Sequence, residues 1–165
     1  MLKPGKDSNA TSSFKPIALL VTLRTVFENL IRIRPEGWCE HHMIFPYTMV
    51  GFRRGKSEVD NICILATHTG QTFGSNQFMV AGFLDIFGAY DNASIQILAN
   101  VLRSIKVSTK ITRCIFNLFA MKFISLNCEG NSCRIAYTGL PQGSSLSPVL
   151  FNIYSHKLAM LTTVP

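Results

Sequence analysis

Two aspartates stand out because the middle of the chain is otherwise without acids. Between residues 61 and 128 only Asp85 and Asp91 carry a carboxylate. Asp85 directly follows residues 77–84, an eight-residue run of strand composition. Burying a carboxylate without a cation or a donor is costly, so we expect a positive group to face Asp85. The alternative is that Asp85 is a buried structural acid. Asp91 is interpreted mainly as the N-cap of a helix that begins near Ala93.

Positive charge is the second chemical feature of the chain. The 165 residues have a formal charge of +7, from 16 Lys and Arg against 9 Asp and Glu. The excess is concentrated in residues 103–134, where Glu129 is the only acid. Such an excess favours a polyanionic partner, although many proteins of similar charge bind no nucleic acid. One functional hypothesis is therefore a non-catalytic nucleic-acid-binding module that uses Arg103, Lys106, Lys110 and Arg113.

Two further patterns are weaker. Residues 51–57 invite comparison with a phosphate-binding loop, but that loop needs four residues between its glycines and here there are three. Cys39, His41 and His42 are metal-binding residue types, yet no second pair follows at the spacing that a four-ligand zinc site requires. We therefore do not expect a nucleoside-triphosphatase loop over 51–57, and we interpret Cys39, His41 and His42 as solvent-exposed side chains.

Composition limits the class of protein. With 47% hydrophobic and 15% charged residues, the chain fits one globular unit that folds without disulfides or a structural metal. The longest apolar stretches, 16–23 and 114–121, are shorter than the roughly 18 residues of a membrane helix, so no membrane insertion is expected. The N-terminus lacks the apolar core of a secretory signal, and five irregularly spaced cysteines favour reduced thiols. An intracellular protein is predicted.

The elements that must position these residues follow from hydrophobic periodicity and from turn residues. In the first half of the chain we expect a helix over 17–33 ended by Pro35, a short strand over 44–50, and a helix from a capping box at Ser57 toward Thr69. A loop with Gly70 and Gly74 and a strand over 77–84 should follow. In the second half we expect helices over 95–105 and 111–121, a hairpin of 123–126 with 134–137, and a helix over 147–161 after a turn at 139–143.

Two long blocks carry a family resemblance. The first is Phe83-Leu84-Asp85-Ile86-Phe87-Gly88-Ala89-Tyr90-Asp91, and the second is Gly139-Leu140-Pro141-Gln142-Gly143-Ser144-Ser145-Leu146-Ser147-Pro148 with residues 150–154. Residues 3–7, 14–20 and 51–57 agree in order and spacing. The sequence resembles the reverse transcriptases of non-LTR retrotransposons over nearly its whole length.

The resemblance implies an α+β protein with the right-hand polymerase fold. Residues 1–75 would correspond to a fingers-like subdomain and residues 76–165 to part of a palm-like subdomain. The activity it implies is RNA-directed DNA polymerisation, with an RNA template, a DNA primer and deoxynucleoside triphosphates as partners. The resemblance sets no oligomeric state.

The resemblance also assigns roles to individual residues. Asp85 matches the first catalytic aspartate, which binds two Mg²⁺ ions in the family. Tyr90 matches the aromatic residue that excludes a ribose 2′-hydroxyl. The other expected contacts are Lys3, Lys15, Gln142 and Gly143 for the nucleotide, with Gln142 and Gly143 also at the template, and Arg53 and Arg54 for template phosphates. For the two arginines a solvated charge run is an equally good interpretation, and Lys15 replaces a more usual arginine.

The departures from the family pattern concern the metal site. Family members carry a Tyr/Phe-Ala-Asp-Asp block after the second long block, and the sequence reaches Pro165 without one. One aspartate supplies too little negative charge to hold two Mg²⁺ ions. Phe87 and Met49 also depart from the usual residues. We therefore expect an inactive fragment, with the nucleic-acid-binding remnant as the alternative.

Overall fold

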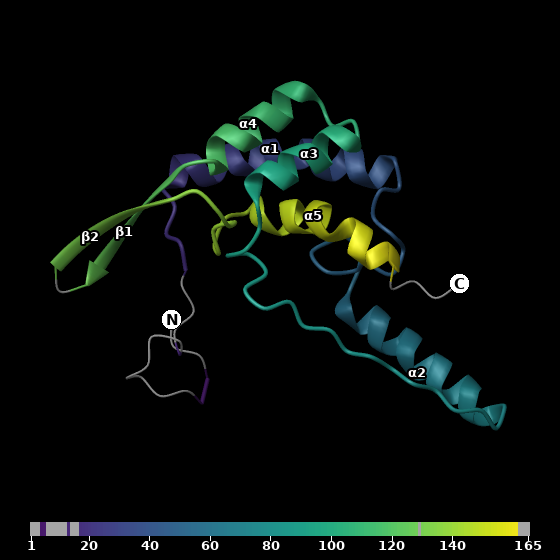
Figure 1. The fold of residues 1–165 in the computed structure, drawn as a ribbon. Helices are drawn as coiled ribbons and strands as arrows, with labels where there is room; N and C mark the ends of the chain where they lie inside the picture. Colours follow the sequence, from purple (N-terminus) through teal and green to yellow (C-terminus); the bar gives the residue numbers. More distant parts are fainter. Residues whose placement is uncertain (1–3, 6–12, 14–16, 129, 162–165) are drawn as a thin grey trace.

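The computed structural model describes residues 4–5, 13, 17–128 and 130–161. Its elements, in chain order, are α1 (Thr22–His41), α2 (Glu58–Gly74), α3 (Ile95–Ser104), α4 (Thr109–Phe119), β1 (Lys122–Cys128), β2 (Gly130–Ala136) and α5 (Ser147–Leu161) (Figure 1). The described part is thus a mixture of helices and a few strands. None of its helices combines the length and hydropathy of a bilayer-spanning segment.

One core joins four of the helices. The long helix α1 contacts α4 and α5, and α3 contacts both of these as well. In Figure 1, α4 lies above α1 and α5 lies below it, while α3 crosses in front of α1 between the two. The core draws on both halves of the chain, and its most deeply buried apolar side chains include Cys39, Leu98, Leu102, Ile115, Phe119, Leu140, Leu146, Leu150 and Ile153.

Periodicity located α3 and α4 correctly. In α3 the buried positions Ile95, Leu98, Ala99 and Leu102 follow the three- and four-residue steps of a helix with one apolar face. In α4 the same pattern buries Thr112, Ile115 and Phe119. The helices expected over 95–105 and 111–121 are confirmed, with α4 beginning two residues earlier than expected at Thr109.

The expected end of α1 at Pro35 is wrong. The helix continues to His41 with Pro35 inside it and buried. A proline in a helix interior removes one hydrogen bond and strains the preceding turn. Packing beyond it compensates, because Cys39 is fully buried and the indole Nε1 of Trp38 donates to the Ile105 carbonyl at 2.8 Å.

The capping box that begins α2 is confirmed. Ser57 accepts from the Val59 amide, and Asp60 accepts from the Ser57 amide. The helix then runs through Gly70 to Gly74, where a loop was expected, and the strand expected over 44–50 is a series of turns instead. No residue of α2 is buried, so local capping rather than core packing defines this helix.

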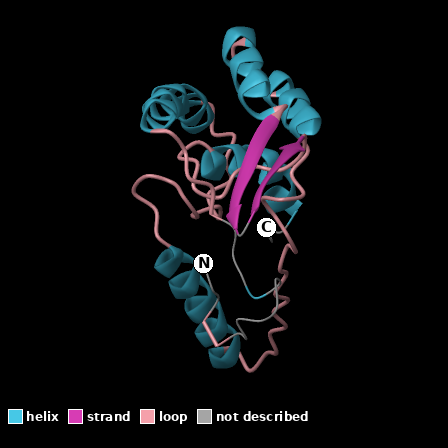
Figure 2. Ribbon diagram, turned by 90° about the vertical axis from the view of Figure 1, so that its left-hand side faces the viewer, coloured by secondary structure: helices cyan, strands magenta, loops and turns pink. Residues whose placement is uncertain are grey.

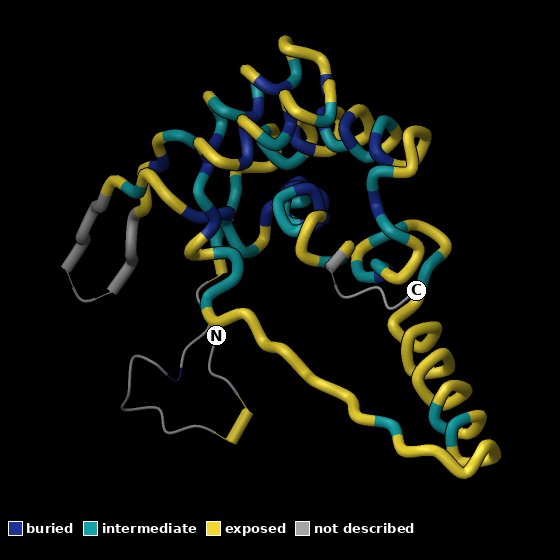
Figure 3. Tube along the Cα trace, turned by 45° about the vertical axis from the view of Figure 1, so that its right-hand side comes forward, coloured by how far each residue is buried: buried dark blue, intermediate teal, exposed yellow. Residues whose placement is uncertain are grey.

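The strand expected over 77–84 does not form in this structure. Residues 77–86 are extended, but no strand pairs with them in the described part of the chain. Figure 3 shows this segment and α2 as a largely exposed arm. Phe78 and Val80 are 98% and 96% exposed. Strand composition alone is insufficient, because a strand requires a neighbour for its backbone groups.

The β-hairpin is confirmed. Strands β1 and β2 pair antiparallel, with Phe123 opposite Ile135. They lie side by side in Figure 2 and extend beyond the helices in Figure 1. The amine of Lys122 anchors the base of the hairpin by donating to the carbonyls of Thr138 and Gly139, at 2.6 and 2.5 Å. Burial and the nearby Arg24 lower the pKa of Lys122. Because Lys122 holds these two carbonyls, the base of the hairpin is joined to the turn at 139–143.

Candidate functional site

Three distant segments meet at the turn over 139–143. The amide of Leu140 donates to the Tyr90 carbonyl at 2.7 Å, and the amide of Gly139 donates to the Ala93 carbonyl at 2.9 Å. On the other side of the turn, the amide of Ala18 donates to the Gln142 carbonyl at 2.7 Å. Backbone hydrogen bonds thus join the two blocks of the resemblance and the segment after Pro16.

Two glycines permit this close approach. Gly139 has a φ of +82°, and a Cβ there would lie 2.8 Å from the Asp91 carbonyl oxygen. Gly143 has a φ of +117°, and a Cβ there would lie 2.6 Å from the Ala18 carbonyl oxygen. Any other residue at these positions would meet both an unfavourable backbone conformation and a backbone clash.

Tyr90 packs on α5 beside this turn. Its ring centroid lies 5.2 Å from that of Phe151, and Phe151 in turn stacks on Tyr154 at 6.3 Å. Burial raises the pKa of the Tyr90 hydroxyl, which is half-buried. The structure therefore holds Tyr90 through its ring, with α5 as the support.

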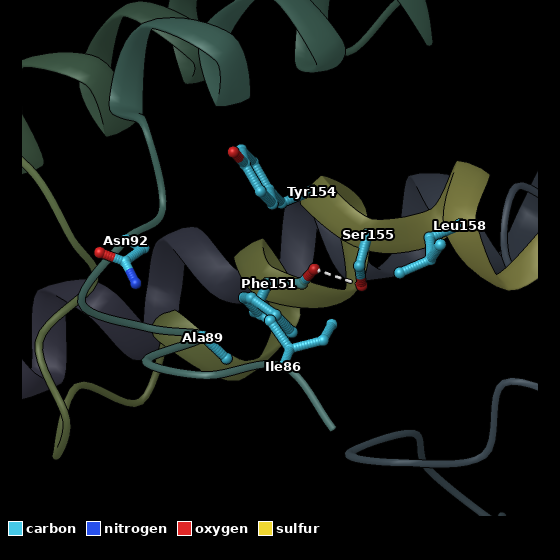
Figure 4. A pocket seen from close by; sticks show the side chains of 7 residues that line it. All are labelled: Ile86, Ala89, Asn92, Phe151, Tyr154, Ser155 and Leu158. Carbon is cyan, nitrogen blue, oxygen red and sulfur yellow. Dashed lines mark hydrogen bonds between the residues drawn. The ribbon is translucent and has the colours of Figure 1, made fainter. Parts of the chain in front are cut away.

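An apolar pocket of about 360 Å³ lies next to these rings (Figure 4). Two of the polar side chains in its wall are engaged in hydrogen bonds: Asn92 donates to the Phe87 carbonyl at 3.1 Å, and Ser155 donates to the Phe151 carbonyl at 2.9 Å. The pocket thus offers mainly hydrophobic surface. Its lining residues are Ile86, Ala89, Asn92, Phe151, Tyr154, Ser155 and Leu158.

The structure corrects the expectations for both aspartates. Asp85 is exposed at the end of the extended segment, and no cation faces it in the described part of the chain, because an exposed carboxylate needs no compensating charge. Asp91 is not the N-cap of α3. That cap is Ser94, whose hydroxyl accepts from the Ile97 amide at 3.4 Å, and α3 begins at Ile95.

The residues considered for zinc are not grouped as ligands. Cys39 was expected to be exposed but is fully buried, and burial together with the neighbouring Glu40 raises the pKa of its thiol to about 12. His42 stacks on Trp38 with ring centroids 3.8 Å apart. Within the described ranges, no group of three or more His, Cys, Asp and Glu side chains could hold a metal ion.

The four expected basic contacts have different surroundings. The guanidinium of Arg53 donates to both oxygens of Glu40, at 2.8 and 2.7 Å, and to the Pro46 and Met49 carbonyls. The side chain of Arg53 is therefore committed to the fold, whereas Arg54 is exposed. Lys3 and Lys15 lie outside the described residues.

Sequence reasoning missed a buried carboxylate behind the turn. Glu28 on α1 is fully buried, and it accepts from the Ser144 hydroxyl at 2.6 Å and from Arg24 Nε at 2.9 Å. In the sequence, Glu28 follows Arg24 by four residues. That spacing by itself indicates only an ion pair on a helix surface. The burial of Glu28 depends on Ser144, which is 116 residues away in sequence.

Comparison with known proteins identifies the family of this site. The model for the reverse transcriptase (RNA-dependent DNA polymerase) family matches residues 2–163. The chain belongs to the reverse transcriptase family. The resemblance to reverse transcriptases of non-LTR retrotransposons is thereby confirmed.

Three relatives illustrate the range of this family. Two are from Drosophila melanogaster: "Probable RNA-directed DNA polymerase from transposon X-element" is 30% identical over 94% of this reverse transcriptase chain, and the corresponding protein of transposon BS is 28% identical over 94%. The group II intron-encoded protein LtrA of Lactococcus lactis is 27% identical over 90%. The chain spans 17% of the length of both Drosophila proteins and 23% of LtrA.

Proposed function

We propose that this chain supplies the first catalytic aspartate, the sugar-contacting aromatic residue and the template–nucleotide turn of an RNA-directed DNA polymerase of the non-LTR retrotransposon type. The observation that supports this proposal is the hydrogen-bonded contact between the turn at Tyr90 and the turn at Leu140. This contact places the turn that carries Tyr90 next to the turn that carries Gln142 and Gly143, and Asp85 lies five residues before Tyr90 in the sequence. The partners would be an RNA template, a DNA primer and deoxynucleoside triphosphates.

The residues present do not fit a complete two-Mg²⁺ site. Two adjacent divalent ions require bridging and flanking carboxylates, and the 165 residues contain no Asp-Asp pair. Asp85 is exposed and could serve as one ligand, whereas Asp91 lies six residues further along, in the turn over 87–92. We therefore propose that the 165-residue polypeptide is inactive by itself.

We further propose the right-hand division of the intact family for this chain, with residues 1–75 fingers-like and residues 76–165 palm-like. The shared core supports a close association of the two parts, because Ile31, Cys39 and Phe45 pack in the same cluster as Leu98 and Leu150. Arg54 is the better candidate for a template phosphate, since Arg53 is bonded within the fold. Lys3 and Lys15 keep their proposed roles at the triphosphate.

Primer extension tests the proposal. We would compare the isolated chain with a chimera in which it replaces the matching segment of the X-element protein, using an RNA template, a DNA primer and Mg²⁺. The chimera should extend the primer, and the isolated chain should not. Asp85→Asn should abolish extension by the chimera, while the matched control Asp91→Asn should retain it. Extension that survives Asp85→Asn would refute the catalytic assignment.

A second candidate function is nucleic-acid binding without catalysis. It is favoured by the exposure of all four cations at the junction of α3 and α4: Arg103, Lys106, Lys110 and Arg113. Their affinity for RNA should arise from counterion release and should fall steeply between about 50 and 200 mM salt. Affinity that does not change with salt, or that survives replacement of all four by Gln, would contradict this candidate.

A further inference from the structure

Glu28 is the most completely buried acid in the described part of the chain, with 0% of its side chain exposed. A buried carboxylate is tolerated only when donors satisfy its oxygens. Each oxygen has one: Oε1 accepts from Arg24 Nε at 2.9 Å, and Oε2 accepts from Ser144 Oγ at 2.6 Å. Of these partners Ser144 is buried, while the Arg24 side chain is 30% exposed.

Ser144 transmits this contact to two parts of the site. Its hydroxyl oxygen accepts from the amides of Leu146 and Ser147, at 3.2 and 3.3 Å, where α5 begins. Its own amide donates to the Pro141 carbonyl at 3.2 Å and closes the turn that contains Gln142 and Gly143. Because the hydroxyl proton points to Glu28, its lone pairs are free for the α5 amides.

We propose that Glu28 is a positioning residue: acting through Ser144, it fixes the Gln142–Gly143 turn relative to α1 and to the start of α5. Charge-assisted hydrogen bonds are stronger and more directional than neutral ones, so a carboxylate holds Ser144 more firmly than an amide would. The functional importance of the turn rests on the proposed function. The fixing of the turn is independent of it and can be measured in the isolated chain without catalysis.

Residue-resolved amide hydrogen exchange tests the proposal. The reporting amides are Leu146 and Ser147, bonded to Ser144, and Ala18, bonded to Gln142. The reference is the amide of Leu98, which donates to the Ser94 carbonyl within the core helix α3. Loss of one acceptor at residue 28 should accelerate exchange at the reporting amides by roughly tenfold relative to Leu98.

Two replacements of similar size separate positioning from space filling. Glu28→Gln keeps one accepting oxygen and Glu28→Leu keeps none, so the local acceleration should be graded from Gln to Leu. Ser144→Ala should reproduce the effect from the other side, and it keeps the test valid if Glu28→Leu does not fold. The control is Glu36→Gln. It breaks a second ion pair within α1, between Arg32 and Glu36 at 3.6 Å, which does not involve Ser144.

The outcomes are distinct. Faster exchange confined to the reporting amides, absent in Glu36→Gln, supports the proposal. Equal acceleration at Leu98 would show that Glu28 only stabilises the whole fold, and unchanged exchange in Glu28→Leu and in Ser144→Ala would show that it only fills space. Either result overturns the positioning role, whether or not the X-element chimera proves active.

Discussion

The amide of Leu140 donates to the carbonyl of Tyr90 over 2.7 Å, so the two sequence blocks typical of the family are in direct backbone contact. This bond stands next to the one from Gly139 to Ala93 at 2.9 Å. Together the two bonds form a short ladder made of backbone groups only. The geometry of the candidate site therefore depends on the backbone at 139–143 more than on any single functional group.

The first prediction concerns the glycine that this ladder requires. Gly139→Ala should lower the free energy of unfolding by about 1–3 kcal/mol from backbone strain alone, with more from the contact to the Asp91 carbonyl. Gly70→Ala is the control, because Gly70 lies in α2 with open space around it and should gain about 0.5–1 kcal/mol. Urea denaturation measures both. Equal stability of Gly139→Ala and the unmodified chain would refute the steric argument.

The second prediction concerns acid. The hydrogen bond from Arg53 holds the pKa of Glu40 below its ordinary value of 4.5. The unfolded chain therefore binds a proton there more readily, so the pair stabilises the fold above about pH 4.5 and loses this effect as pH falls through the lower, folded pKa. Because 40% of the Glu40 side chain is exposed, solvent keeps the effect small.

Glu40→Gln provides the measurement of this effect. Its stability deficit relative to the unmodified chain, followed by thermal melting, should be present near neutral pH and should shrink as the solution is acidified below about pH 4.5. A deficit of constant size across this range would show that the ion pair is not the cause.

The third prediction concerns the exposed extended segment. Residues 77–84 carry no charge, and Phe78, Val80 and Phe83 are 98%, 96% and 84% exposed. Uncharged segments of this kind that lack a sheet neighbour promote association. The chain should sediment as oligomers, and Phe78→Lys with Val80→Lys should shift it toward monomer at unchanged melting temperature. Leu19→Lys, at a residue 95% exposed outside this segment, should not. A monodisperse monomer of the unmodified chain would contradict the prediction.

Sequence patterns predicted the elements whose stabilisation is local or periodic. The apolar spacing in α3 and α4, the capping box at Ser57 and the hairpin between β1 and β2 are all readable within about a dozen residues. The expected end of α1 at Pro35 was wrong, because the burial of Cys39 and the hydrogen bond from Trp38 to the Ile105 carbonyl outweigh the cost of a proline in the helix. These compensating contacts lie far away in sequence, where no local pattern reports them.

The candidate site was predicted to a similar extent. The family motifs located Tyr90 and the glycine turn, and the structure brings them together. The cap of α3 was assigned to Asp91 rather than Ser94 because both residue types cap helices, and only the backbone determines which one accepts from the first turn. Glu28 was missed because its burial results from packing between α1 and the start of α5.

The final prediction concerns sugar selection and rests on the packing of Tyr90 against Phe151, with ring centroids 5.2 Å apart. In the X-element chimera, Tyr90→Val should raise the kcat/KM for ribonucleotides relative to deoxyribonucleotides by roughly ten- to hundredfold, because a smaller side chain leaves room for the 2′-hydroxyl. Tyr90→Phe is the matched control, since it keeps the ring and should keep the discrimination. Phe151→Ala should give an intermediate ratio, because the supporting ring is lost while Tyr90 remains. If Tyr90→Val and Tyr90→Phe discriminate equally well, Tyr90 does not contact the sugar, and its stacking on α5 serves only the fold.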